Sequence, residues 1–305
     1  MYLPRARRQA GHRLLAGRLP LVTLGLAVAS LMAHKAEPVR AQEASLDLLR
    51  YAAATYVRSA YPRLANLVAT EEYRQQLGAP PNGLISTRPR ERTLKSEVLL
   101  VRHPAETSNW LFFRDVLEVD GKPVPDHQDR LTNLFISPTV ANWELVREIA
   151  HADRQYHLPG STAAETNPFI VVALMDRSYW PRLLFKRGKQ DKDVGPGVFR
   201  LEFEEEKSDQ EPILTRGMAR GTAWIEAATG RILQTEVRIG SSLGAPISRT
   251  TFRYDEALQV AVPVDMKTTW SPGAPSISIK GSAKYGNFRQ FAVRTDESLK
   301  GNKDR

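Results

Sequence analysis

Alternation of apolar and polar residues along the C-terminal half is the pattern that most limits how this chain of 305 residues can fold. Phe199, Leu201 and Phe203 are separated by Arg and Glu residues, which is typical of a strand with one buried and one solvent-facing side. Gly281 and Gly286 suit bulges or sharp bends in a curved sheet. Such a run of strands with short connections predicts a wide antiparallel sheet whose apolar face must be covered. After residue 220 the pattern continues in the segments 222–239, 252–254, 260–270, 277–280 and 283–293.

The N-terminal half predicts one helix and several strands. Apolar residues at three- and four-residue spacings predict a helix over residues 45–60, which Pro62 should end. Residues 110–119 are apolar on both faces, so we expect a strand that is covered twice. Asp120 and Gly121 directly after it are typical of a two-residue hairpin turn. Further strands are expected at 64–75, 94–102 and 122–124.

Mid-chain residues predict the cover of the sheet. One amphipathic helix is expected to start near Asp126 and a second after Ser137, so that helices span residues 126–157. Residues 167–174 fit a helix and a strand nearly equally, because several of them are β-branched. The predicted fold class is therefore α+β: a large curved antiparallel sheet, an incomplete barrel, covered by a few helices within a single domain of residues 42–294.

The first 41 residues have the composition of an export signal. Basic residues precede an apolar stretch from Leu21 to Met32, which is shorter than the roughly 20 residues needed to span a bilayer. Val39 and Ala41 fill the two positions that signal peptidase reads, so we expect cleavage after Ala41 and a periplasmic or extracellular protein that is not integral to the membrane. An uncut N-terminal membrane anchor is the alternative. The charged residues 295–305 are expected to form a loose tail.

Charge and cysteine content exclude several classes of protein. The net charge is +9, but residues 1–41 hold seven basic side chains and one acid, which leaves +3 for the rest. We therefore predict no binding to nucleic acid, which needs a concentrated basic face. The chain has no cysteine, which excludes disulfides, thiolate nucleophiles and cysteine metal ligands.

No motif in the sequence identifies a reaction. His151, Asp153 and His157 suggest a metal site, yet their spacing does not place them on one face of a helix, so we predict neither a metal nor another cofactor. The acidic runs at 71–72 and 204–206 could supply the two carboxylates of a glycoside hydrolase. Adjacent acids on a strand point to opposite faces, however, and we interpret both runs as solvated edges.

Large apolar side chains are abundant on the segments expected to form the inner face of the sheet and its helical cover. They suit either an ordinary packed core or the wall of an apolar cavity. The candidate ligand-lining residues are Phe113, Leu134, Phe135, Trp143, Phe203 and Trp270.

The stretch Trp-Ile-Glu-Ala-Ala-Thr-Gly-Arg-Ile-Leu at 224–233 resembles a hairpin of periplasmic carriers of the lipoprotein-localisation type. Segments 279–281 and 285–289 are also similar to the closing strands of that superfamily. The resemblance, which covers residues 198–293, implies an incomplete barrel closed by helices that holds acyl chains or other lipids, with the helices at 126–157 as a lid. The long helical insertion departs from the family pattern, and the chain as a whole looks most similar to uncharacterised exported bacterial proteins.

These observations favour an exported, non-catalytic protein that binds a lipid or another apolar ligand between the sheet and its cover. The alternative is an envelope scaffold or interaction module, which would bind an envelope protein through a sheet edge or the N-terminal helix. A carboxylate-dependent hydrolase is a third hypothesis.

Overall fold

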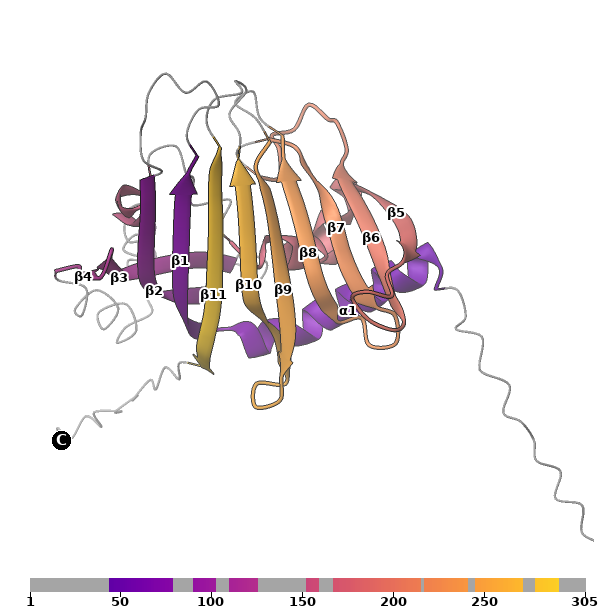
Figure 1. Ribbon diagram of the computed structural model, residues 1–305. Coiled ribbons are helices and arrows are strands. Elements are labelled where there is room, and N and C mark those ends of the chain that lie inside the picture. The colour runs from indigo at the N-terminus through magenta and orange to yellow at the C-terminus, as the bar shows by residue number, and fades with distance from the viewer. Residues whose placement is uncertain are drawn as a thin grey trace, which may run out of the picture. The chain divides into compact units, whose positions relative to one another are not determined.

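One antiparallel sheet joins all the strands found in the described part of the chain (Figure 1). The computed structural model describes residues 44–78, 90–102, 110–125, 152–158, 167–214, 217–240, 245–270 and 278–290. The eleven strands of these residues are β1 Leu67–Leu77, β2 Arg90–Arg102, β3 Trp110–Val119, β4 Lys122–Pro123, β5 Leu183–Gln190, β6 Val198–Glu205, β7 Ala219–Glu226, β8 Ile232–Ile239, β9 Ile247–Asp255, β10 Val260–Trp270 and β11 Ile279–Gln290. The helical elements are α1 Leu46–Leu64, η1 Asp153–Tyr156, α4 Ile170–Leu174 and η3 Arg177–Arg182.

The strand order shows how the two halves of the chain combine. It runs β4-β3-β2-β1-β11-β10-β9-β8-β7-β6-β5, so each half forms its own series of neighbouring strands. The two series meet where β1 pairs with β11 along nearly its whole length. The sheet stays open, because β4 and β5 lie at its opposite ends. The predicted wide antiparallel sheet is confirmed.

Alternation along the strands separates a covered face from a wet face. Phe199, Leu201 and Phe203 are all buried, whereas Arg200 and Glu202 between them are exposed and half-buried. This is the pattern that the sequence predicted for β6.

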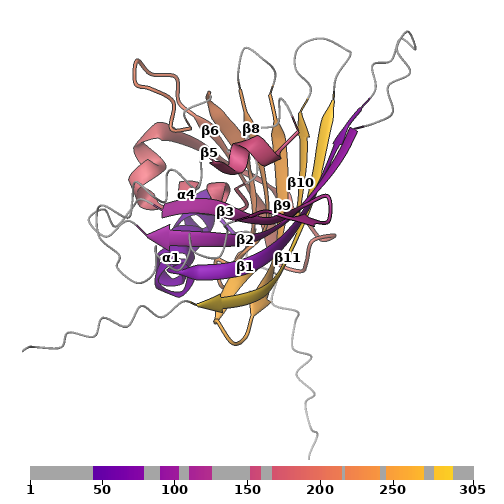
Figure 2. The same cartoon turned by 90° about the vertical axis from the view of Figure 1, so that its left-hand side faces the viewer.

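Two helices pack on the covered face. The side of α1 that faces the sheet is buried and belongs to the same core cluster as residues of α4 and of β6 to β10, so both helices lie on one face of the sheet (Figures 1 and 2). Helix α1 crosses several strands and contacts β5, β6 and β10. Its buried residues are Leu49, Ala53, Val57, Ala60 and Leu64.

A glycine in the turn between β7 and β8 sets how closely α1 approaches the sheet. Gly230 has a φ of +74°, and a Cβ atom there would lie 2.2 Å from the carbonyl oxygen of Ala52 in α1. Only glycine combines this left-handed backbone with such close contact to a helix backbone. The predicted turn after β3 is also confirmed, because Asp120 and Gly121 have φ values of 52° and 77°.

The structure corrects two details and settles one alternative that the sequence left open. Helix α1 continues through Pro62 to Leu64, because the hydrogen bond that proline removes would join position 62 to the carbonyl of Arg58, and both residues lie on the exposed side of the helix. The regular two-residue spacing expected along β10 is broken by a register shift between Pro263 and Asp265. The open alternative at 167–174 resolves as helix α4.

The predicted mid-chain cover lies almost wholly outside the described residues. Of the insertion at 126–157, the structure describes only residues 152–157, which include the short helix η1. The described helical cover therefore consists of α1, α4 and short 3-10 turns.

Replacing Gly230 with alanine should lower the free energy of unfolding by about 2–4 kcal/mol, because the new methyl group meets the α1 backbone and the left-handed conformation is strained. Gly121→Ala is the matched control. Its φ is equally positive but its Cβ would meet nothing within 4 Å, so the loss should be about 1 kcal/mol. Urea denaturation of both variants measures the difference, and equal losses would show that α1 does not pack against this turn as described.

Candidate functional site

A buried ion pair on the covered face joins β1 to β3 across the intervening strand β2. Arg114 of β3 binds Glu71 of β1 in a two-point arrangement, in which Nε donates to Oε2 and Nη2 donates to Oε1 at 2.7 Å. The two side chains are 2% and 0% exposed, so both charges are fully removed from water. A bidentate guanidinium–carboxylate pair is the arrangement best able to offset that desolvation.

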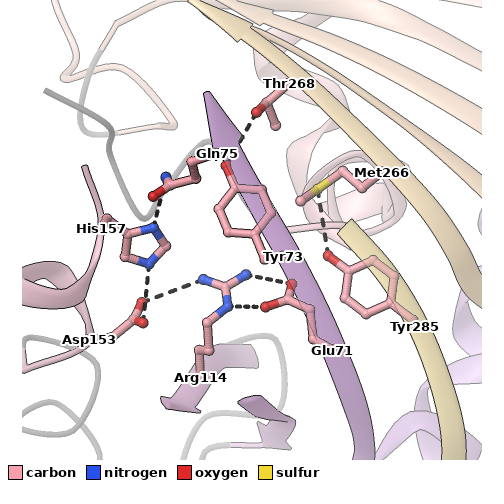
Figure 3. A network of polar contacts seen from close by, with 9 residues as sticks. All are labelled: Glu71, Tyr73, Gln75, Arg114, Asp153, His157, Met266, Thr268 and Tyr285. Carbon is pink, nitrogen blue, oxygen red and sulfur yellow. Dashed lines mark hydrogen bonds and ion pairs between the residues drawn. The ribbon is translucent and has the colours of Figure 1, made fainter. Parts of the chain in front are cut away.

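The same arginine connects the sheet to η1 (Figure 3). Its Nη1 lies 3.4 Å from Oδ2 of Asp153, and Asp153 also accepts a hydrogen bond from Nε2 of His157 at 3.1 Å. Nδ1 of His157 lies 3.0 Å from the side-chain nitrogen of Gln75 on β1. We call Glu71, Gln75, Arg114, Asp153 and His157 the buried polar network.

The hydrogen bonds indicate which ring nitrogen of His157 donates and which one accepts. The backbone N–H of Leu158 donates to Oε1 of Gln75 at 2.9 Å, which turns the NH2 group of that amide toward the imidazole ring. Nδ1 of His157 must therefore accept, and Nε2 carries the proton that it donates to Asp153. These contacts hold the imidazole ring in one orientation and fix residues 153–158 to β1.

Burial and the neighbouring charges have opposite effects on the pKa values of Arg114 and Asp153. Burial alone would lower the pKa of Arg114, but Glu71 and Asp153 outweigh it and hold this pKa well above its ordinary value. Burial would raise the pKa of Asp153, but Arg114 and the hydrogen bond from His157 lower it. All the charges of the network are therefore satisfied internally, which indicates a structural role.

Two buried tyrosines border the network. Tyr73 lies 3.3 Å from Oγ1 of Thr268, and Gly281 provides the space for it, because a Cβ there would lie 2.3 Å from the tyrosine oxygen. Gly281 therefore lets the Tyr73 ring pack against β11. Tyr285 donates to the sulfur of Met266 at 3.7 Å. Burial raises the pKa of both phenols, so they remain hydrogen-bond donors.

An apolar pocket adjoins the network where the sheet faces the start of α4. The Phe169 ring lies between those of Phe112 on β3 and Phe252 on β9, with centroids 6.4 and 6.2 Å away. In a flat sheet β3 and β9 would be about 24 Å apart, so the sheet curves around Phe169. The pocket is lined by Phe112 and Phe169 together with Leu67, Ala69, Val98, Leu99, Leu100, Pro168, Pro263, Tyr285 and Phe288. We call this site the Phe169 pocket.

The pocket and the network share two side chains. Tyr285 lines the pocket and is one of the residues bordering Glu71, while the Phe112 ring centroid lies 5.6 Å from the guanidinium carbon of Arg114. The free volume of the pocket is about 10 Å³, close to the space that one water molecule needs. Because Phe169 fills the space, a larger ligand could enter only if this ring moved.

The structure describes three of the six predicted lining residues. Phe113 is buried, but it alternates with Phe112 and Arg114 and so lies on the opposite face of β3. Phe203 is buried in the core of β6, and Trp270 is half-buried at the end of β10. None of the three lines the Phe169 pocket. Leu134, Phe135 and Trp143 lie outside the described residues, so the proposed lining role remains a prediction.

The acidic runs each contribute one buried glutamate, contrary to their interpretation as solvated edges. Glu71 binds Arg114, and Glu205 binds Arg182 at 3.0 Å and accepts hydrogen bonds from two backbone N–H groups. The one basic residue in the mostly apolar stretch 110–119, Arg114, was the available signal for the buried pair. The described residues contain no group of three or more His, Asp or Glu side chains that could hold a metal ion.

Arg114→Met should lower the free energy of unfolding by about 3–5 kcal/mol, because it leaves Glu71 buried without its partner. Arg289→Met is the matched control, since its ion pair with Glu97 is largely exposed and should contribute less than about 1 kcal/mol. Chemical denaturation compares the two variants. Similar small losses would mean that the Arg114 pair is not buried in solution.

Asp153 should make stability fall in acid. Its pKa in the folded state lies below the ordinary value of 3.8, so it stabilises the fold above that value and loses this contribution as the pH falls through the folded-state pKa. Asp153→Asn keeps the acceptor for His157 but cannot titrate. The difference in unfolding free energy between wild type and D153N should therefore shrink as the pH is lowered, whereas a constant difference would contradict the ion pair.

Comparison with known proteins found no matching family model and no matching curated protein. Among solved structures, the chain is similar to a putative outer membrane lipoprotein-sorting protein domain from Vibrio parahaemolyticus, with 11% identity, a TM-score of 0.34, and coverage of 81% of this chain and 95% of that one. A DUF1329 family protein from Desulfovibrio piger has 9% identity, a TM-score of 0.31, and coverage of 79% and 95%. The first is named for the class of protein that the 224–233 hairpin resembles, but these TM-scores establish neither a shared fold nor a shared function.

Proposed function

We propose that this protein binds an acyl chain or another apolar ligand between the curved sheet and the segment around Phe169. The observation that carries the proposal is the Phe169 pocket itself, in which apolar side chains from six strands lie around one aromatic ring. Removing an apolar ligand from water would supply the affinity without a charged anchor.

The segment that covers the pocket is suited to movement. Helix α4 has five residues and no side-chain cap at its N-terminus. A helix this short has little stability of its own, so it depends on packing. At the start of α4, the Phe169 ring contacts the rings of Phe112 and Phe252. An acyl chain could take the place of this ring and make similar apolar contacts. Displacing Phe169 would open the space that the small pocket lacks.

The buried polar network limits what part of a ligand can enter. Arg114 is fully paired with Glu71 and Asp153, so it is not available to bind a carboxylate or phosphate in the pocket. A charged group would also have to lose its water without a partner. The charged end of a ligand should therefore stay outside, and affinity should depend on chain length more than on the headgroup.

The alternative hypotheses have less support. Edge strand β5 carries Lys186 and Lys189, and lysine on an edge strand discourages pairing with a partner strand. A hydrolase would need two available carboxylates, yet Glu71 and Glu205 already bind Arg114 and Arg182.

We also infer that residues 1–41 direct export of the protein. A carrier of apolar ligands in the cell envelope would act outside the cytoplasm.

A direct test uses the protein stripped of lipid and then exposed to fatty acids of increasing chain length, with bound ligand measured by native mass spectrometry. Wild type should retain one or more apolar molecules. Phe169→Ala should bind roughly tenfold more tightly, because the ring no longer has to leave its apolar surroundings before the ligand enters.

Phe113→Ala is the matched control, since it removes a buried phenylalanine from the same part of the sheet but on the opposite face. Its affinity should equal that of wild type. The proposal is wrong if neither wild type nor F169A binds any fatty acid, or if F113A changes binding as much as F169A does.

A further inference from the structure

The solvent-facing side of α1 combines exposed apolar side chains with basic ones. Among the described residues the large apolar side chains that are exposed are Leu48, Tyr51 and Leu184, at 49%, 46% and 56%. Leu48 and Tyr51 are three residues apart and therefore share one face of α1. Arg58 is exposed two turns further along the helix. This face points away from the buried residues that pack on the sheet.

A cluster of aromatic rings and arginines surrounds Tyr51. Its ring packs edge-on against Trp180 of η3, with centroids 5.1 Å apart. The guanidinium of Arg177 lies 4.7 Å from the Tyr51 ring, and that of Arg50 lies 4.4 Å from the Trp180 ring. Tyr51 is nevertheless almost half exposed, so the cluster presents apolar rings and cations to solvent side by side. We call Leu48, Tyr51, Arg58, Arg177 and Trp180 the α1 docking face.

The charge of this helix favours an anionic partner. Helix α1 carries Arg50, Arg58 and Arg63 against the single acid Asp47, so its net charge is +2. Asp47 is bound to Arg50 at 2.9 Å, which leaves the C-terminal half of the helix as its basic part. Arg177 beside Asp176 adds no net charge. Leucine, tyrosine and tryptophan next to basic residues are the side chains that occupy the boundary between water and the acyl region of a bilayer.

In the alternative that leaves residues 1–41 uncut, the chain that precedes α1 gives a second reason to expect a membrane here. Residues 21–32 are apolar, and residues 33–43 separate them from the first described residue, Ala44. Eleven residues reach at most about 40 Å when fully extended. A membrane entered by the apolar stretch would therefore lie within reach of the first turns of α1, which carry Leu48 and Tyr51. No helix in the described segments is long and apolar enough to cross a bilayer.

We propose that the α1 docking face binds the surface of a bilayer that contains anionic phospholipids, with Leu48 and Tyr51 inserted at the boundary and Arg58 near the phosphates. The site is separate from the Phe169 pocket, because it uses the solvent side of α1 and no residue that lines the pocket. Membrane docking therefore holds or fails independently of the proposed ligand binding.

Cosedimentation with vesicles tests this proposal. The protein starts at residue 42, because residues 41–305 form one compact unit and the apolar stretch 21–32 would bind vesicles by itself. Vesicles of phosphatidylcholine alone are compared with vesicles of phosphatidylcholine and phosphatidylglycerol in equal amounts. Wild type should bind the anionic vesicles more tightly, and added salt should weaken that binding.

Two variants should weaken binding to the anionic vesicles. The double variant Leu48→Ser with Tyr51→Ser should lose roughly tenfold or more, because it removes the inserted apolar area. Arg58→Ser should lose about fivefold, as expected for one basic residue near an anionic surface. Circular dichroism establishes that the variants remain folded.

Leu184→Ser and Arg220→Ser are the matched controls, because both side chains are exposed on the opposite face of the sheet. Both should bind vesicles as wild type does. The proposal is overturned if wild type binds neither kind of vesicle, if it binds both kinds equally, or if L184S weakens binding as much as the α1 double variant. Absence of vesicle binding would leave a protein surface as the partner of this face.

Discussion

Burial of one face of a very wide sheet is the constraint on which the rest of this structure depends. Each half of the chain supplies an antiparallel series of strands, and the pairing of β1 with β11 joins them into a single surface. That surface is apolar on one side, so helices must pack on it. Helix α1 covers the part formed by β5 to β10, held close by Gly230, while the short α4 segment fills the curve between β3 and β9 with one phenylalanine ring.

The two kinds of cover differ in how firmly they are attached. Residues 153–158 are fixed by charged and polar contacts, because Asp153 binds Arg114 while His157 and the Leu158 N–H both bind Gln75. Such a network has few alternative arrangements, since each buried polar group would be left without a partner if one moved. Phe169, in contrast, is held by apolar contacts that another apolar molecule can replace. The firm anchor therefore lies at η1, and the entrance that we propose for a ligand lies at α4.

The sequence predicted those features that depend only on residues close together along the chain. The alternation in β6 and the Asp120-Gly121 turn are local patterns, and both are confirmed. Features that depend on contacts across the sheet were not predictable in this way. Glu71 and Arg114 are 43 residues apart, and neither residue type by itself indicates burial. The choice between Phe112 and Phe113 was likewise missed, because both are aromatic and only the register of β3 decides which one faces the Phe169 pocket.

Locating a bound ligand tests the central claim most directly. A crystal structure of the protein with a fatty acid brominated along its chain would show the bromine by anomalous scattering. We expect the bromine between the strands that line the Phe169 pocket and a displaced Phe169 ring, with the carboxylate outside and the pair between Arg114 and Glu71 unchanged. Bromine found only on the outer surface, with Phe169 still between Phe112 and Phe252, would contradict the account.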